Sequence, residues 1–322
     1  MIITVTLNPA MDRTLAVPNF RLGHRHRAIE QTSMAGGKGV NVARALKTLG
    51  QPVIATGIAG GHTGTRIIEQ LTEDAILNDF VRIRGESRTS TAVVDPTSGV
   101  QTEINERGPV IAEAELELFV DKLLYLAKGA EVCVFAGSLP PGVQPGIYAE
   151  LIGELKKLGV VCVLDSEGEP LRLGTKAGPD VVAPNQIEAE ELVGHEFSDE
   201  EDRVLAVAEM AAMGAREAIM TLPDGCIAAV DEGEGERRMY RVTVEHQEAV
   251  SAVGSGDAFL AGYVAARYSG RSPADGLRFA VACGAESTLH FGAGVLDPHE
   301  AERLMDEVTV EELSAPAFDE VS

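Results

Sequence analysis

Cysteine is scarce in this sequence, and its spacing supports neither a bridge nor a metal site. The 322 residues include four cysteines, none in a C-x-x-C pair, and the seven histidines show no ligand spacing such as H-E-x-x-H. Disulfide frameworks and structural zinc sites need more numerous or more closely spaced ligands. We therefore expect buried thiols in a reducing cytoplasm, and neither a disulfide framework nor a zinc site.

Long apolar runs are also missing. None reaches the roughly 18 residues that a membrane-spanning helix requires, so an integral membrane protein is not expected. Residues 1–7 lack the basic segment and the cleavage site of a signal peptide, and we interpret them as a first strand.

Basic residues are few. The sequence has 27 Lys and Arg against 50 Asp and Glu, which gives a formal net charge of −23. Such a chain repels a phosphate backbone, so no nucleic-acid partner is expected. If the protein binds an anionic substrate, a few basic residues must gather at that site to offset the negative potential of the rest of the chain.

Apolar residues, in contrast, are abundant and fall into short runs. Hydrophobic residues make up 45% and charged residues 24%, as in globular proteins, and the length allows one large α/β domain. The apolar runs predict strands at 2–7, 53–58, 132–136, 160–165, 180–183, 217–222 and 227–230. Amphipathic stretches predict helices at 39–49, 65–73, 113–127, 145–158, 202–213, 257–268 and 273–289. This alternation favours a mostly parallel sheet with helices on both faces.

Two stretches depart from this alternation. Residues 13–34 and 89–105 are typical of strand pairs without intervening helices, with turns at 19–23 and 95–99. We expect them to form one small antiparallel sheet, inserted in a single domain of residues 1–322, that covers a site or pairs with another subunit. The acidic tail after Asp306 is expected to be a loosely held end.

The segment Gly254-Ser255-Gly256-Asp257 carries the clearest chemical signal. Small residues at the start of a helix let a ligand approach free N–H groups, which together with the helix dipole attract an anion such as a phosphoryl group. Asp257 beside that anion hole could take the proton of an acceptor hydroxyl. The alternative is an ordinary helix cap, which would not require the small residues before it.

A second glycine turn, Gly36-Gly37, opens a helix that contains Lys38 and Asn41. It is not a P-loop, because the glycine spacing differs and Lys38 is followed by glycine. Gly37 and Asn41 could hold sugar hydroxyls, and Lys38 could hold a substrate phosphate. A tight helix entry with a surface lysine is an equally good interpretation of this segment alone.

Polar residues follow three other predicted strands, at the sheet edge where open α/β folds bind ligands. Asp12 could accept hydrogen bonds from sugar hydroxyls, or it could simply form a turn after Pro9. Asn185 and Glu188 could hold a hydrated Mg²⁺, or they could form a capping box. Ser138 lies in a further turn at this edge.

The sequence has neither a G-x-S-x-G elbow nor a G-x-G-x-x-G fingerprint, so hydrolase and dehydrogenase functions lose their usual support. The motifs together resemble the PfkB (ribokinase-like) carbohydrate kinases, in particular the branch of 1-phosphofructokinases, tagatose-6-phosphate kinases and minor 6-phosphofructokinases. The resemblance covers residues 6 to about 304 and includes segments 35–46, 60–64, 137–142, 165–169 and 251–264.

The resemblance implies a Rossmann-like α/β/α sandwich with a small β lid, through which two subunits would form a homodimer. It implies that Asp257 is the base and that Gly254, Ser255 and Gly256 form the anion hole. The remaining implied contacts are sugar binding by Asp12, Gly37 and Asn41, substrate-phosphate binding by Lys38 and Arg88 with Ser138 nearby, organisation of Mg²⁺ and nucleotide phosphates by Asn185 and Glu188, and nucleotide binding by Thr221 and Gly225.

Three positions depart from the family pattern. Ala183 replaces a common lysine, Pro223 replaces a glycine in a shortened nucleotide turn, and Ser251 replaces an acid or Asn. The resemblance implies an ATP-dependent kinase that makes fructose 1,6-bisphosphate from fructose 1-phosphate. Fructose 6-phosphate and tagatose 6-phosphate remain alternative substrates, and a non-catalytic sugar-phosphate sensor is the alternative of another class.

Overall fold

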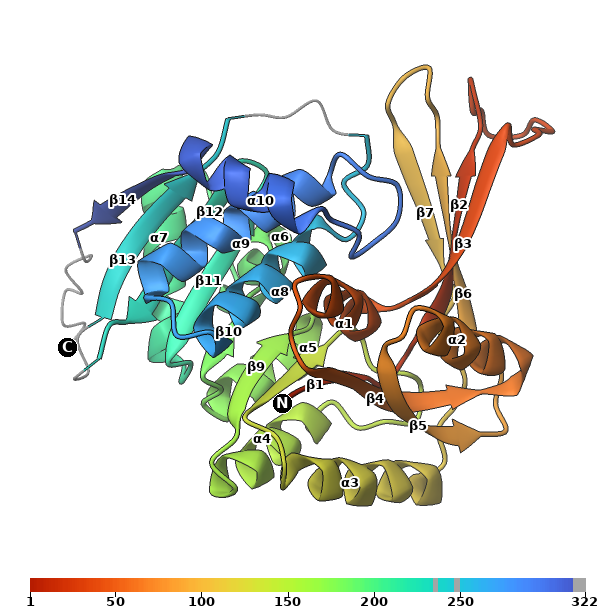
Figure 1. The fold of residues 1–322 in the computed structure, drawn as a ribbon, viewed down its shortest axis with the longest axis horizontal. Coiled ribbons are helices and arrows are strands. Elements are labelled where there is room, and N and C mark those ends of the chain that lie inside the picture. Colours follow the sequence, from red (N-terminus) through yellow and green to blue (C-terminus); the bar gives the residue numbers. More distant parts are fainter. Residues whose placement is uncertain (234–236, 246–249, 315–322) are drawn as a thin grey trace.

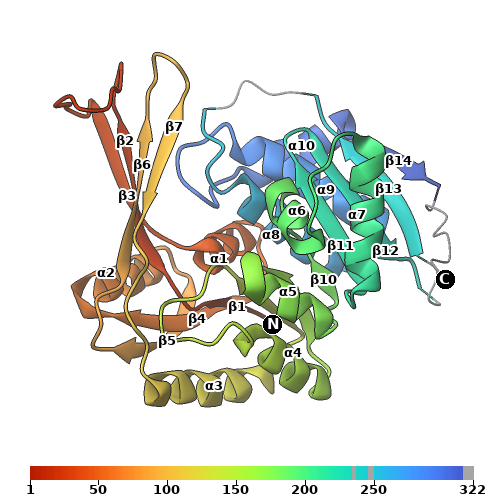
Figure 2. The same ribbon diagram turned by 180° about the vertical axis from the view of Figure 1, so that it is seen from behind.

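The fold is described from a computed structural model, in residues 1–233, 237–245 and 250–314. Figures 1 and 2 show a large twisted sheet with helices on both faces, and a smaller sheet that projects from one side of this body. Among the described residues, no helix combines the length and the apolar character needed to cross a bilayer.

The large sheet has ten strands in the order β14-β13-β12-β11-β10-β9-β8-β1-β4-β5. The strands from β11 to β5 run parallel, and β12, β13 and β14 add antiparallel neighbours at one edge. Their bounds are β1 Ile2–Thr6, β4 Val53–Gly60, β5 Leu77–Ile83, β8 Val132–Ala136, β9 Val161–Asp165, β10 Val181–Val182, β11 Glu217–Leu222, β12 Gly225–Asp231, β13 Arg237–Thr243 and β14 Thr309–Leu313.

Helices cover both faces of this sheet because alternate strand residues point to opposite sides. Ile2 packs into the core cluster shared with α1, α2, α8 and α9, and Ile3 packs into the cluster shared with α3, α4, α6 and α7. The helices are α1 Lys38–Thr48, α2 Gly61–Glu73, α3 Glu113–Ala127, α4 Ile147–Lys157, α5 Gly168–Lys176, α6 Gln186–Val193, α7 Glu200–Ala212, α8 Ser255–Tyr268, α9 Pro273–Ser287 and α10 Pro298–Leu304.

The predicted strands and helices of this body are confirmed, with shifts of a few residues at their ends. The four cysteines are buried, as the sequence predicts. The expectation of a loose tail after Asp306 is wrong for Thr309–Leu313, because β14 pairs with β13. An ion pair between Arg238 and Glu312, at 3.6 Å, also joins the two strands. Residues 315–322 of that tail lie outside the described residues.

The small sheet contains β2 Ala10–Ala16, β3 Glu30–Gly36, β6 Arg88–Val94 and β7 Gln101–Asn105, in the order β3-β2-β6-β7. Both predicted antiparallel pairs are present, and they join through β2 and β6, which run parallel. The carboxylate of Asp95 ties the two hairpins together, since it accepts hydrogen bonds from the N–H groups of Asn19 and Phe20 at 2.9 and 3.1 Å.

Candidate active site

Two cavities lie side by side at the carboxyl ends of the parallel strands. The smaller, of about 370 Å³, is bordered by the small sheet and the start of α1. The larger, of about 840 Å³, is bordered by the starts of α6 and α8 and the turn between β11 and β12. Lys38, Glu103 and Val253 line both cavities, so a ligand in one would meet a ligand in the other at these residues.

The start of α8 forms one wall of the larger cavity. Gly254, the N-cap residue, has φ 77° and offers no side-chain cap, so first-turn N–H groups remain for an external acceptor. A Cβ on Gly254 would lie 2.5 Å from Cβ of Ala293, whereas one on Gly256 would meet nothing within 4 Å. The turn is therefore tightly packed behind Gly254 and open towards the cavity at Gly256, an arrangement that can hold an anion.

Asp257 lies in the first turn of α8 and is 6% exposed. Its Oδ2 accepts a hydrogen bond from Nδ2 of Asn41 at 2.8 Å. The pKa of Asp257 is raised to about 7, mainly by burial and then by Asp165, while Lys38 and the Asn41 bond oppose this shift. A carboxyl group with a pKa near neutrality is suited to exchange a proton during a reaction at neutral pH.

Asn41 is itself held by a buried cation. Arg44 donates from Nη1 to Oδ1 of Asn41 at 3.3 Å and to the carbonyl of Ala293 at 3.0 Å, and from Nη2 to the carbonyl of Ala35 at 2.5 Å. The Asn41 amide is thereby oriented with its nitrogen towards Asp257. Arg44 thus connects α1, the end of β3 and the segment packed against Gly254.

Lys38 lies at the junction of the two cavities. Its Nζ is 2.7 Å from Oδ1 of Asp165 and 3.0 Å from Oε1 of Glu188. These carboxylates, with Asp257, hold the pKa of Lys38 above its usual value and outweigh the opposite effect of burial. Burial raises the pKa of Asp165, and its ion pair with Lys38 opposes that shift.

Asn185 and Glu188 form the capping box that the sequence offered as an alternative. Oδ1 of Asn185 accepts from the N–H of Glu188, and Oε2 of Glu188 accepts from the N–H of Asn185, each at 2.9 Å. The other oxygen of Glu188 meets Lys38, and both residues line the larger cavity. Capping therefore does not remove these side chains from the site.

The side chains of Asp165, Asn185 and Glu188 bring oxygen atoms to this junction, and oxygen is the ligand type that Mg²⁺ prefers. The described residues contain no group of three or more Cys, His, Asp and Glu that could enclose a metal ion. The carboxylates of Asp165 and Glu188 are bound by Lys38, so the donor set fits a hydrated Mg²⁺ held mainly by water and phosphate oxygens.

Asp12, on β2, faces the smaller cavity and is partly buried. Burial raises its pKa to about 6, while Arg88, the N–H of Gly37 and Arg44 oppose that shift. Gly36 is paired with β2 so closely that a Cβ there would lie 1.8 Å from Oδ2 of Asp12. The second glycine turn thus leaves room for the Asp12 carboxylate beside the start of α1.

Arg88 and Ser138 lie on the other side of the smaller cavity. Arg88 donates from Nε to the carbonyl of Asn8 at 3.1 Å and from Nη1 to that of Glu106 at 3.2 Å, and it forms no ion pair with the described residues. Buried oxygens of Thr6 and Asn8, in the same lining, have no hydrogen-bond partner in the described chain. Arg88 and Ser138 are available to a polar ligand.

The β11–β12 turn borders the larger cavity with Thr221, Pro223 and Gly225, and Ala183 lies in the same lining. The departures at Ala183 and Pro223 therefore fall at this cavity. Its apolar wall, which the sequence did not indicate, comes from Phe259 and Val281 on α8 and α9.

The structure brings every predicted site residue to one of these two cavities. The smaller is lined by Asp12, Gly37, Lys38, Asn41, Arg88 and Ser138, and the larger by Lys38, Asn185, Glu188, Thr221, Gly225, Gly254, Ser255, Gly256 and Asp257. Asp165 and Arg44 were given no role from the sequence, although both lie inside segments that carry the family resemblance.

Known proteins resemble the chain over most of its length. A family model described as pfkB family carbohydrate kinase matches residues 5–300. A tagatose-6-phosphate kinase of Staphylococcus epidermidis is 31% identical over 317 residues, covering 97% of this chain and 100% of the relative. A 1-phosphofructokinase of Borreliella burgdorferi is 31% identical over 313 residues, covering 97% and 99%.

Two solved structures have the same fold. Escherichia coli phosphofructokinase-2, in complex with substrates and products, matches with a TM-score of 0.87 at 28% identity, over 95% of this chain and 98% of that one. Arabidopsis thaliana ribokinase, complexed with ribose and ATP, matches with a TM-score of 0.73 at 20% identity, over 94% and 98%. The second likeness concerns the fold alone.

Proposed function

The chain belongs to the PfkB family of carbohydrate kinases, and from that premise we propose that it transfers the γ-phosphoryl group of ATP to a hydroxyl of a ketohexose phosphate. The observation that carries the proposal is the meeting of two cavities at Lys38, with Asp257 beside an uncapped helix start. A nucleotide in the larger cavity and a sugar in the smaller would place donor and acceptor at that junction.

The chemistry assigned to the junction is an in-line transfer. The acceptor hydroxyl lies between Asp12 and Asp257, and its proton passes to Asp257 as the new O–P bond forms. The bond between the γ-phosphorus and the leaving oxygen of ADP breaks in the same step, and ADP departs. First-turn N–H groups of α8, from Ser255 to Asp257, stabilise the charge on the phosphoryl oxygens, so that positioning and electrostatics supply most of the rate enhancement.

Lys38 assists at the same place. Its ammonium group already lies between two carboxylates, and a phosphoryl group entering the junction would add a third anionic partner. Asn185 and Glu188 would orient a hydrated Mg²⁺ through its water ligands. When bound, that ion neutralises part of the charge on the nucleotide phosphates.

The smaller cavity supports a substrate that already carries a phosphate. Arg88 has no carboxylate partner among the described residues and lies beside Ser138 and the unpartnered oxygens of Thr6 and Asn8. In a chain of charge −23, a guanidinium that bonds backbone carbonyls and has no carboxylate partner in a sugar-sized cavity favours an anionic sugar over a neutral one. Fructose 1-phosphate is our first choice, and fructose 6-phosphate and tagatose 6-phosphate are the alternatives.

We also propose a homodimer that forms through the small sheet, acting as a lid. Four large apolar side chains of its strands and connecting loops are exposed, namely Leu22, Ile29, Val100 and Ile104. Exposed apolar side chains gathered on one projecting element are typical of an association surface. A cytoplasmic location is part of the same proposal and agrees with the free thiols of the four cysteines.

A coupled ADP-release assay tests the proposed function. The acceptors are fructose 1-phosphate, fructose 6-phosphate, tagatose 6-phosphate and the unphosphorylated sugars, each with ATP and Mg²⁺. We expect release with at least one phosphorylated ketohexose and little with the free sugars. Calorimetry can show whether the chain binds a sugar phosphate but not ATP and Mg²⁺. That result would overturn the kinase proposal in favour of a non-catalytic sugar-phosphate sensor.

A further inference from the structure

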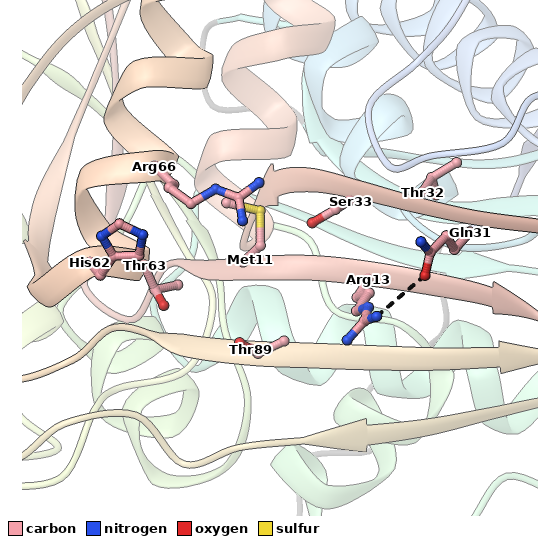
Figure 3. Close-up of a pocket in the computed structure, with 9 residues that line it drawn as sticks. All are labelled: Met11, Arg13, Gln31, Thr32, Ser33, His62, Thr63, Arg66 and Thr89. Carbon is pink, nitrogen blue, oxygen red and sulfur yellow. Dashed lines mark hydrogen bonds between the residues drawn. The ribbon is translucent and has the colours of Figure 1, made fainter.

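A third hollow, of about 450 Å³, lies outside the two cavities of the active site. It is bordered on one side by strands β2, β3 and β6 of the small sheet and on the other by the first turns of α2, which belongs to the main body. Figure 3 shows Arg13 and Thr89 on the strands and His62 and Arg66 on the helix, around one space. Its volume is within the range of small-molecule sites.

The charge of this lining is opposite to that of the chain as a whole. The chain has a net charge of −23, yet the residues that line the hollow include two arginines and a histidine and no Asp or Glu. Arg13 donates a hydrogen bond to the neutral side chain of Gln31 at 3.3 Å, and Arg66 forms neither an ion pair nor a side-chain hydrogen bond with the described residues. Two guanidinium groups therefore border the hollow without an anionic partner.

Glu86, at the helix side of the hollow, is already engaged. The carboxylate of Glu86 accepts hydrogen bonds from the N–H groups of His62 and Thr63 at 3.0 and 2.6 Å, and so caps the start of α2. A hydrogen bond from the hydroxyl of Thr63, together with these two backbone bonds, lowers the pKa of Glu86, which keeps its charge at this helix end. Ligand binding in the hollow would accordingly depend on the side chains of Arg13 and Arg66, not on the helix N–H groups.

The chemistry of the lining selects a phosphate group. A guanidinium offers paired N–H donors that match the oxygens of a phosphate, and a second guanidinium can meet the remaining charge. Hydroxyl groups of Ser33 and Thr89 lie in the same lining and can donate to further oxygens. Because the hollow is much larger than one phosphate ion, its ligand would carry an organic part as well.

The position of the hollow connects it to the active site. Met11 and Arg13 border it, and Asp12 between them on β2 points to the other face of the strand, into the smaller cavity. Arg13 also reaches the rim of that cavity. A ligand that contacts both Arg13 and Arg66 would bridge β2 and α2, and would fix the strand that carries Asp12.

We propose that this hollow binds a phosphorylated small molecule, separately from the substrate and nucleotide cavities, and that its occupation holds the small sheet against α2. The binding part of this proposal is independent of the kinase function. The consequence for substrate binding rests on the proposed function.

Calorimetric titration of the full chain with pyrophosphate, at low ionic strength, tests the binding. Arg66→Gln removes the guanidinium on the helix side, and its exposed position should leave folding unaffected, as a melting curve will verify. The matched control is Arg82→Gln, because Arg82 is exposed, lies outside the lining and contacts the same helix through Thr65 at 3.4 Å. Pyrophosphate that binds in the active-site cavities is retained in both variants, so the difference between them isolates the hollow.

We expect Arg66→Gln to weaken one class of pyrophosphate sites at least tenfold, and Arg82→Gln to change it by less than twofold. Equal binding by both variants would overturn the proposed site, and so would the absence of any binding that depends on Arg66. In the kinase assay, pyrophosphate should alter the KM for the sugar phosphate several-fold more in the wild type than in Arg66→Gln, in which only binding in the active-site cavities remains. Loss of binding in Arg66→Gln without that kinetic difference would retain the site and overturn its link to β2.

Discussion

Nδ2 of Asn41 donates a hydrogen bond to Oδ2 of Asp257 over 2.8 Å, between residues 216 positions apart in the sequence. The bond occupies one oxygen of the carboxylate and leaves the other for the acceptor hydroxyl. It also holds the Asp257 side chain in place and stabilises its charged form, which burial disfavours. The predictions below follow from this pair and from the groups around it.

The raised pKa of Asp257 predicts a pH-dependent difference in stability. Burial raises this pKa from 3.8 to about 7, so between those values the folded state keeps a proton that the unfolded state has released. The contribution of Asp257 to the free energy of unfolding therefore falls as pH rises through that window. Asp257→Asn carries no such proton and can still accept the bond from Asn41. It should match the wild type near pH 4 and exceed it above pH 7 by up to about 4 kcal/mol.

Urea unfolding of both proteins at several pH values measures this difference. Asp12, whose pKa is also raised, is present in both proteins, so its titration is common to the two curves. A difference that does not change between pH 4 and pH 8 would show that Asp257 is not desolvated as described.

The two glycines of the α8 turn should respond differently to alanine. Gly256→Ala adds a methyl group to open space, so the free energy of unfolding should change by less than about 1 kcal/mol. The same methyl group projects where phosphoryl oxygens would meet the N–H groups, so kcat/KM for ATP should fall tenfold or more. In Gly254→Ala, the alanine would have to adopt the left-handed φ of 77°, and its methyl group would clash with Ala293. This variant should destabilise the fold by about 1–3 kcal/mol. Wild-type kinetics in a folded Gly256→Ala protein would place the anion hole elsewhere.

Replacement of Lys38 and of Arg88 should affect the kinetics of the two substrates differently. Arg88 lines only the smaller cavity, so Arg88→Ala should raise the KM for the sugar phosphate tenfold or more and leave that for ATP within twofold. Lys38 lines both cavities, so Lys38→Ala should raise the KM for the sugar phosphate and lower kcat/KM for both substrates, in part because Asp165 and Glu188 lose their counter-charge. An unchanged sugar-phosphate KM in either variant would remove its assigned role.

Arg44→Lys tests whether Arg44 positions Asn41. A lysine cannot meet the three acceptors that Arg44 holds, so the Asn41 amide should lose its fixed orientation and kcat should fall on the order of tenfold. Arg267→Lys is the control, because Arg267 pairs with Glu217 at 3.2 Å near the far end of α8. It should cost stability and leave kcat unchanged. Equal kcat in the two variants would assign Arg44 a purely structural role.

The sequence could predict the site residues whose role is indicated by their immediate neighbours in the chain. Gly254–Asp257, Asp12 and Asn185 each follow a strand or open a helix, and their residue types suffice to indicate anion, hydroxyl or metal binding. The pairing of Lys38 with Asp165 and Glu188 could not be predicted in this way, because it joins positions 127 and 150 residues apart. Neither could the parallel pairing of β2 and β6, which depends on how two separate hairpins meet.

The last two strands of the chain show a second limit. β13 and β14 have many charged residues and lack the continuous apolar run that predicted the central strands. Their pairing is supported by opposite charges across the ladder, such as Arg238 and Glu312, which become neighbours only in the folded chain. A prediction that depends on continuous apolar runs therefore misses both strands.

The central claim is that Asp257 takes the proton of the acceptor hydroxyl. Its most direct test is the turnover of Asp257→Asn in the ADP-release assay, with sugar-phosphate affinity measured by calorimetry on the same protein. We predict a turnover lowered by a factor on the order of 10² or more, with affinity within a few-fold of the wild type. Turnover equal to that of the wild type would contradict the claim.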